Sequence, residues 1–224
     1  MNIRIILSFI AFIYMFAASG QKNSAIDSLE NILKTDKEDT TKVNNLLLIC
    51  DEYREISDYE NVRQYAESAL LLAKTLDYKK GIARSYTRIG LTYELQINYP
   101  EALENYFSAL KTYKEIGDKI GIGWCYHSFG WIYRAEGNFA KALDNYFLSL
   151  KTYEEIGNKK DIAFAYFEIA VVYSYQSNYP KAFEYYFKAL KIYKEIGEKR
   201  YIASCYLHIG VILTNLGNFP DALG

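Results

Sequence analysis

Apolar residues recur at steps of three and four along most of this chain, which is the spacing that places side chains on one face of an α-helix. One such run contains Ile122, Tyr126, Phe129, Gly130 and Tyr133. A second run follows with Ala142, Tyr146, Leu150 and Tyr153. Glu136-Gly137-Asn138 separates the two runs and has the composition of a turn. The pattern therefore predicts two consecutive helices joined by a short connection.

The same arrangement returns every 40 residues. Its aromatic and small positions align as Tyr86, Tyr126, Tyr166 and Tyr206, as Gly90, Gly130, Ala170 and Gly210, and as Ala102, Ala142, Ala182 and Ala222. The self-similarity predicts units over residues 39–78, 79–118, 119–158 and 159–198 and a partial unit over 199–224, with the first a weaker copy. Because the last unit breaks off within its second helix, we expect the chain to be a fragment or to be completed by a partner.

Start and stop signals agree with these helices. Asparagine can cap a helix start, because its side-chain oxygen accepts from an unpaired backbone amide, and we expect this of Asn98, Asn138, Asn178 and Asn218. Glycine can adopt the left-handed conformation that ends a helix, and we expect this of Gly117, Gly157 and Gly197. Gly90 and Ala102 are small positions, at which we expect two helices to approach closely while tyrosines fill the surrounding space.

The order of these positions, Tyr86-x2-Ile89-Gly90-x2-Tyr93 and then Ala102-x3-Tyr106-x2-Ala109, resembles the tetratricopeptide repeat signature, with tyrosine where tryptophan often stands. The resemblance covers residues 39–224, although Lys114, Glu154 and Lys194 replace the late proline of the family. The 40-residue length is similar to the Leu-Gly-Asn subclass, whose tripeptide occurs at residues 216–218. HEAT arrays and propeller blades have similar periods, but the helical pattern and the order of small and aromatic positions favour the tetratricopeptide family. The resemblance implies an all-α, right-handed superhelical solenoid of antiparallel helix pairs.

The first residues differ in composition from the repeats. Residues 1–20 contain a short basic start, an apolar stretch and a small-residue end, the layout of a secretory signal. This predicts an exported, periplasmic protein, or a membrane-anchored one if the segment is not cleaved. Residues 21–38 then form a capping segment, in which we expect a helix over 25–34 to pack on the first unit through Ile26, Leu29 and Leu33.

The first helix of each unit also has positions that packing does not use, and their chemistry changes from unit to unit. By resemblance to the family, these positions line a concave groove that receives a protein or peptide. They are Arg84, Thr87, Leu91, Trp124, His127, Trp131, Arg134, Phe164, Phe167, Val171, Tyr175, Leu207 and Val211. The alternative is that Trp124, Trp131, Phe164 and Phe167 pack against neighbouring helices. His127 is a candidate polar contact to a ligand, whereas His208 falls on a position that Arg88, Ser128 and Glu168 predict to be solvated.

Composition narrows the function classes. With 26 basic and 27 acidic residues the formal net charge is −1, so nothing favours nucleic acid as a partner. The three cysteines, Cys50, Cys125 and Cys205, are interpreted as buried apolar residues, and no spacing of cysteine or histidine predicts a metal site or another cofactor. The sequence lacks a phosphate-binding glycine loop, a nucleophile elbow and a Cys/His dyad, so we expect no catalysis.

The expected function is therefore that of a non-catalytic protein- or peptide-binding module. Its signal and repeats resemble the exported input regions of bacterial sensor histidine kinases and nucleotide cyclases, with an output domain downstream. The alternative is a free-standing periplasmic or cytoplasmic adaptor. A membrane would be reached only through an uncleaved N-terminal anchor or a downstream segment.

Overall fold

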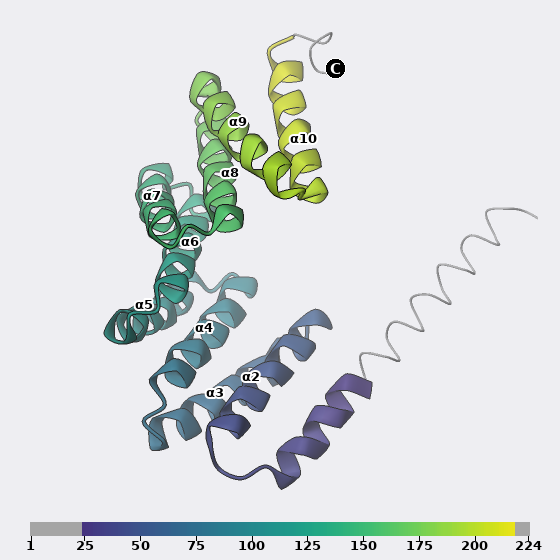
Figure 1. Cartoon of the computed structure of the whole chain (residues 1–224), viewed down its shortest axis with the longest axis vertical. Helices are drawn as coiled ribbons and strands as arrows, with labels where there is room; N and C mark the ends of the chain where they lie inside the picture. Colours follow the sequence, from purple (N-terminus) through teal and green to yellow (C-terminus); the bar gives the residue numbers. More distant parts are fainter. Residues whose placement is uncertain (1–23, 218–224) are drawn as a thin grey trace, which may run out of the picture. The chain divides into compact units, whose positions relative to one another are not determined.

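The fold of residues 24–217 is described by a computed structural model. Within this range every regular element is a helix, so the predicted all-α class is confirmed (Figure 1). An N-terminal helix occupies residues 24–35. It is followed by α2 (Thr40–Glu55), α3 (Tyr59–Thr75), α4 (Lys79–Leu95), α5 (Tyr99–Ile116), α6 (Lys119–Ala135), α7 (Phe139–Ile156), α8 (Lys159–Tyr175), α9 (Tyr179–Ile196) and α10 (Lys199–Asn215). None of the described helices is long and apolar enough to cross a bilayer.

The predicted helix ends take the expected conformations where the structure describes them. Gly157 and Gly197 have φ of 76° and 75°, the left-handed region in which glycine meets no steric penalty. Asn138 and Asn178 accept from the backbone amides of the residues three positions later and so cap α7 and α9. Asn218, predicted to act in the same way, and the predicted signal at residues 1–20 lie outside the described residues.

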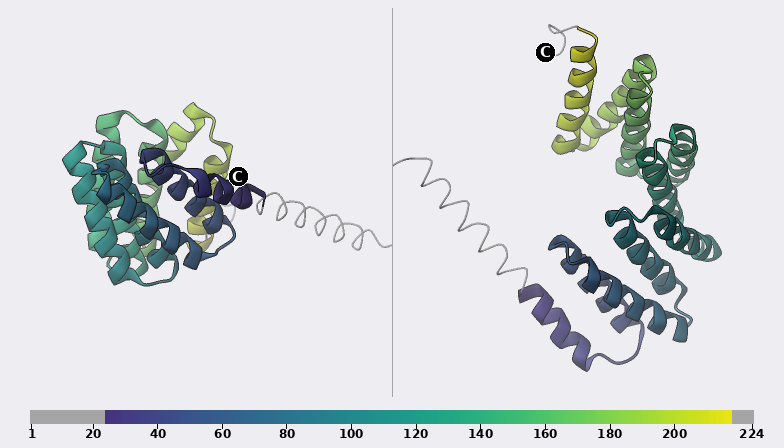
Figure 2. Two further views of the ribbon diagram at one scale, coloured as in Figure 1. Left: turned by 90° about the horizontal axis from the view of Figure 1, so that it is seen from below. Right: turned by 180° about the vertical axis from the view of Figure 1, so that it is seen from behind.

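The chain divides into two compact units, Met1–Thr112 and Tyr113–Gly224. In the first unit, α3 packs against both α2 and α4 (Figure 2). The N-terminal helix places Ile26 and Leu33 in the same apolar core as Val43 and Leu47 of α2. Glu30 of this helix accepts hydrogen bonds from Tyr53 at 2.7 Å and from a second tyrosine at 3.0 Å. The prediction that residues 25–34 pack on the first helix pair is therefore confirmed.

Close contact between paired helices depends on the small residues. A Cβ atom at Gly90 would lie 2.6 Å from the ring of Tyr106 and 3.2 Å from the carbonyl oxygen of Ala102. At Gly130 it would lie 2.7 Å from the ring of Tyr146, a side chain with 0% of its surface exposed. The expectation that glycine and alanine permit this approach while tyrosines fill the space around them is confirmed.

In the second unit, α7, α8, α9 and α10 contribute to a continuous apolar core. Ala142 and Ala182 are fully buried in it at equivalent positions of two successive pairs. All three cysteines of the chain are buried and unpaired, as the sequence predicted. The repeat therefore fixes the core, and the side chains on the remaining helix faces are free to differ.

Candidate functional site

The first halves of α6 and α8 use their predicted groove residues for packing within the unit. His127 lies between Phe164, at 4.9 Å between ring centroids, and Tyr146, at 5.5 Å. Phe167 is 9% exposed and contacts the rings of Tyr186 and His208 at 5.5 and 5.1 Å. These ring contacts join successive helices. Phe164 and Phe167 therefore follow the alternative prediction, in which the aromatic residues pack against neighbouring helices. Trp124 and Trp131 are half-buried.

The second halves of α6 and α8 instead border an open cleft, which we call the Arg134 cleft. It has a volume of about 390 Å³ and is lined by Trp131, Arg134, Ala135, Gly137, Phe139 and Tyr175. The rings of Phe139 and Tyr175 are stacked with 5.9 Å between centroids. None of the six lining residues is acidic, so Arg134 is the charged group of this cleft.

A second cleft, of about 400 Å³, lies between α8 and α10, and we call it the His208 cleft. Its walls include Val171, Ser174 and Tyr175 of α8, Tyr186 of α9, and Leu207, His208 and Val211 of α10. Tyr175 lines both clefts and is 63% exposed, while Leu207 and Val211 are 66% and 52% exposed. The sequence predicted Trp131, Arg134, Val171, Tyr175, Leu207 and Val211 as one set, and the structure places these six around the two adjoining clefts.

A buried polar network underlies the Arg134 cleft. Glu168 is 8% exposed, and its Oε2 accepts from the Tyr146 hydroxyl at 3.2 Å and lies 3.5 Å from Nη2 of Arg134. Burial raises the pKa of the Glu168 carboxyl, which the charge of Arg134 and the Tyr146 hydroxyl oppose. The Nε atom of Arg134 is buried and has no hydrogen-bond partner. The pair therefore satisfies part of the guanidinium and leaves donor capacity unused.

Histidine behaves differently from the expectation. Burial, and then the charge of Arg134, lower the pKa of His127 to about 4, so the ring is neutral at pH 7. Its Nε2 atom is enclosed without a partner rather than turned toward solvent. The interpretation of the His208 position as solvated is wrong, because Ser128 and Glu168 at equivalent positions are buried and His208 stacks on Tyr186 at 5.6 Å. The polar residue types at this repeat position suggested solvent exposure, but their side chains pack against other residues or contact polar groups between the helices.

In the compact unit Met1–Thr112, two of the predicted groove residues, Arg84 and Thr87, make hydrogen bonds within that unit. Arg84 donates to Asn44 at 3.0 Å, and Thr87, which is buried, donates to the carbonyl oxygen of Ala83 at 2.9 Å. Leu91 is half-buried. Glu94 accepts from Tyr106 at 2.7 Å, while burial raises the pKa of its carboxyl to about 7. This face is polar and internally bonded, unlike the apolar clefts of the second unit.

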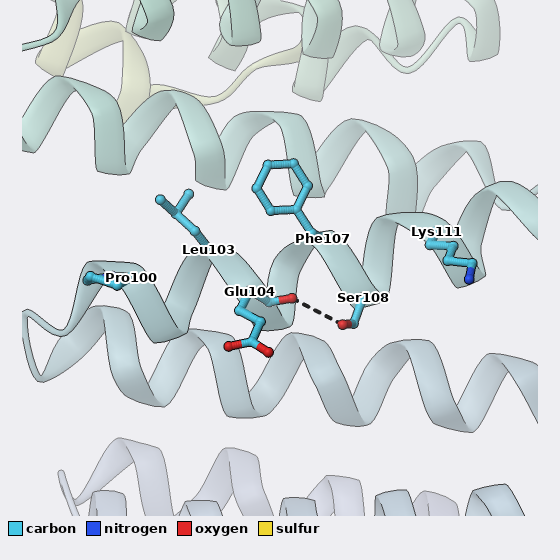
Figure 3. A pocket seen from close by; sticks show the side chains of 6 residues that line it. All are labelled: Pro100, Leu103, Glu104, Phe107, Ser108 and Lys111. Carbon is cyan, nitrogen blue, oxygen red and sulfur yellow. Dashed lines mark hydrogen bonds between the residues drawn. The ribbon is translucent and has the colours of Figure 1, made fainter.

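A further depression lies on the surface of α5, with all its lining residues on that one helix (Figure 3). Leu103 and Phe107 form its apolar part, and the hydroxyl of Ser108 donates to the carbonyl oxygen of Glu104 at 3.1 Å, as in Figure 3. A depression on one helix offers a ligand few convergent groups, whereas the two clefts above combine side chains from three helices. Among the described residues no group of histidine, cysteine, aspartate and glutamate side chains could hold a metal ion.

Comparison with known proteins decides the family. The sequence profile of the tetratricopeptide repeat matches residues 81–155 and 161–224, more than half of the chain. The chain belongs to the tetratricopeptide repeat family. No curated protein matches it by sequence.

Solved structures with similar folds are distant in sequence. A Rap protein in complex with competence and sporulation factor is 19% identical, with a TM-score of 0.78, and the match covers 94% of this chain and 60% of that one. A signal-transduction ATPase with a tetratricopeptide repeat sensor from Pyrococcus horikoshii is 23% identical, with a TM-score of 0.77 over 92% of this chain and 32% of that one. BtubC from P. vanneervenii is 17% identical, with a TM-score of 0.74 over 91% and 84%. At these identities the likeness concerns the fold alone.

Within this tetratricopeptide repeat chain, sequence reasoning missed several groups that shape the clefts. Glu168 and His208 were assigned to solvent, while Phe139 and Tyr186 were not considered as cleft residues. The signal available was positional: Tyr186 and Tyr146 recur at one repeat position, and Ser174 and Arg134 recur at another. The tyrosine hydroxyl at the first of these repeat positions lies near the residue at the second, whose type changes from repeat to repeat. In the preceding repeat, for example, the Tyr106 hydroxyl donates to Glu94.

Proposed function

We propose that this chain is a non-catalytic module that binds a protein or peptide on the face formed by α6, α8 and α10. The observation that carries the proposal is the pair of adjoining clefts, which exposes Tyr175, Leu207 and Val211 beside Arg134. Exposed apolar side chains grouped around cavities are typical of interaction sites, because burial against a ligand removes them from water. The family supports the same proposal, since its repeats suggest a protein-binding module.

The binding test is selection of a phage-displayed library of random dodecapeptides on the purified chain, followed by affinity measurement with synthetic copies. We expect the selected peptides to bind Tyr175→Ala about tenfold or more weakly, because an exposed aromatic anchor that lines both clefts is lost. Phe187→Ala is the matched control, since Phe187 is 54% exposed on α9 and lines neither cleft. Failure to select any peptide, or equal weakening by both variants, would contradict the proposal.

We further propose that the module is the exported sensory input region of a larger bacterial signalling protein. Two observations support this: the secretory layout of residues 1–20, and the likeness to a signal-transduction ATPase whose repeats are described as a sensor. In such a protein, occupation of the clefts would be transmitted through the helices that follow.

Export is tested by expressing the chain with its own N-terminus in a bacterium that has an outer membrane. N-terminal sequencing of the protein from the periplasmic fraction should find cleavage near Gly20. An intact Met1 in a cytoplasmic product would contradict export while leaving peptide binding open.

A further inference from the structure

Helix α5 carries an exposed apolar stripe beside the face that it packs into the core. On the core face, Ala102 and Tyr106 are fully buried. The stripe consists of Pro100, Leu103 and Phe107, of which Leu103 is half-buried and the Phe107 side chain is 53% exposed. The apolar arc of a surface helix normally matches the surface that its neighbours cover, so an arc that extends beyond them indicates a further partner.

The stripe lines the depression on α5 that Figure 3 shows, which has a volume of about 520 Å³. Glu104 and Lys111 complete its lining, and along the helix Phe107 lies between these two charged residues. A depression formed by one helix is too open to enclose a small ligand. It does fit the side chains of a second helix laid across it, because packed helices place the side-chain ridges of one in the grooves of the other.

The charges on α5 restrict which helix fits. Glu104 and Lys111 are exposed and seven residues apart, so they lie about 10 Å apart on one face, with Phe107 close to their midpoint. When two copies of such a helix pack antiparallel about a twofold axis near Phe107, Glu104 of each copy meets Lys111 of the other. Parallel packing would instead place like charges together. The face is therefore complementary to itself in the antiparallel, twofold arrangement, which is the arrangement of most homodimers.

The equivalent faces of α7 and α9 are less suited to this pairing. On α9, Glu184 already forms an ion pair of 2.6 Å with Lys188, and this lysine follows Phe187, so a twofold axis there would bring two lysines together. On α7, Phe147 is only 36% exposed and its ring contacts Tyr185 at 6.0 Å between centroids. On α5 the residue after the phenylalanine is a serine, whose hydroxyl donates to a backbone carbonyl of its own helix.

We propose that two copies of this chain associate through α5, antiparallel about a twofold axis, with Phe107 of each copy in the depression of the other. The two peptide clefts are lined by residues of the second compact unit, whereas the α5 depression is lined by residues of the first. Self-association therefore goes beyond the proposed peptide binding, and each of the two stands or falls without the other.

The first experiment is sedimentation velocity of the full chain at concentrations from about 1 to 300 μM. The face of one helix is a small interface, so we expect a reversible dimer whose fraction rises with concentration. Phe107→Ala should weaken the association about tenfold or more, because it removes the apolar group at the centre of the interface. Phe187→Ala is the matched control, since Phe187 is 54% exposed at the equivalent position of α9, and it should associate like the wild type.

The second experiment tests the antiparallel arrangement by exchanging charges. Glu104→Lys alone and Lys111→Glu alone each place like charges together at both ends of the interface, so each variant should remain a monomer. An equimolar mixture of the two places opposite charges at both ends, so it should form a dimer again. Glu184→Lys and Lys191→Glu change the same charges on α9, and each of these variants alone should associate like the wild type. Circular dichroism confirms that every variant keeps its helices.

The outcomes decide the inference in either direction. A wild-type chain that remains a monomer over the whole concentration range would overturn it, as would Phe107→Ala that associates like the wild type. Glu104→Lys that dimerises alone, or a mixture of the two α5 variants that stays monomeric, would also overturn it. Dimers that the single α5 variants lose and that their mixture recovers, with the α9 variants unaffected, support the twofold pairing of α5.

Discussion

Replacing Ala142 by leucine tests the helix pairing on which every assignment depends. Ala142 has 0% of its surface exposed and lies in the core of the second unit with Tyr146. The paired helices approach so closely that a single Cβ added at Gly130 would lie 2.7 Å from the Tyr146 ring. Leucine adds three carbon atoms to alanine, and this core has no room for them without moving a helix or a tyrosine ring.

The expected cost follows from overpacking. Extra methylene groups forced into a close-packed core destabilise a protein by about 1–3 kcal/mol. For a domain of this size, each kcal/mol corresponds to about 2–4 °C in the melting temperature, so we expect a fall of roughly 2–12 °C. The matched control is Ala140→Leu on the same helix, where Ala140 is exposed and the change should stay within about 0.5 kcal/mol.

Thermal unfolding of both variants is followed by circular dichroism at the helical minimum. Melting midpoints are the appropriate comparison, because a repeat array need not unfold in one two-state transition. A midpoint for Ala142→Leu equal to that of the wild type, or an equal loss in Ala140→Leu, would show that the helix-pair register is wrong.

Three further predictions concern the groove, the thiols and the N-terminal helix. Trp131→Ala should weaken the selected peptides about tenfold with an unchanged helical dichroism signal, whereas collapse of that signal would make Trp131 a core residue. Burial raises the pKa of Cys50 and Cys125 to about 12, so their thiols should react with Ellman's reagent only after unfolding, and fast reaction of the native chain would contradict their burial. Hydrogen bonds from two tyrosines hold the pKa of Glu30 below its ordinary value, so docking of helix 24–35 should be favoured above the unfolded-state pKa and lost as pH falls through the folded one. Hydrogen exchange of that helix, corrected for intrinsic rates, measures this, and Glu30→Gln should flatten the pH profile.

The fold was predictable because a period of 40 residues repeats its small, aromatic and capping positions in register. Gly90, Ala102 and Tyr106 indicate one helix pair. Gly157 indicates a helix end, where its left-handed φ of 76° is one that few other residues tolerate. These features are local or repeated, so comparing each 40-residue repeat of the sequence with the next reveals them. The helix pairing needed no information beyond the sequence.

The site was predictable only in part, because it depends on how successive repeats face one another. Periodicity identifies which positions of a helix lie away from its partner, but it does not state how much of each side chain the next repeat covers. Phe167 on α8 and Trp131 on α6 belong to the same helix face but lie four residues apart in the repeat, and Phe167 is buried against the following helices while Trp131 borders a cleft. The burial of Glu168 likewise depends on Arg134 and Tyr146, which come from other helices.

Hydroxyl-radical footprinting with and without a selected dodecapeptide shows whether a peptide binds on the α6–α8–α10 face of the second unit. Tyr175 and Leu207 are exposed at the clefts, and Leu148 and Phe187 are exposed away from them, so each side chain reports its own coverage. Saturating peptide should protect Tyr175 and Leu207 and leave oxidation of Leu148 and Phe187 unchanged. Protection of Leu148 or Phe187 with Tyr175 and Leu207 unaffected would contradict binding on this face.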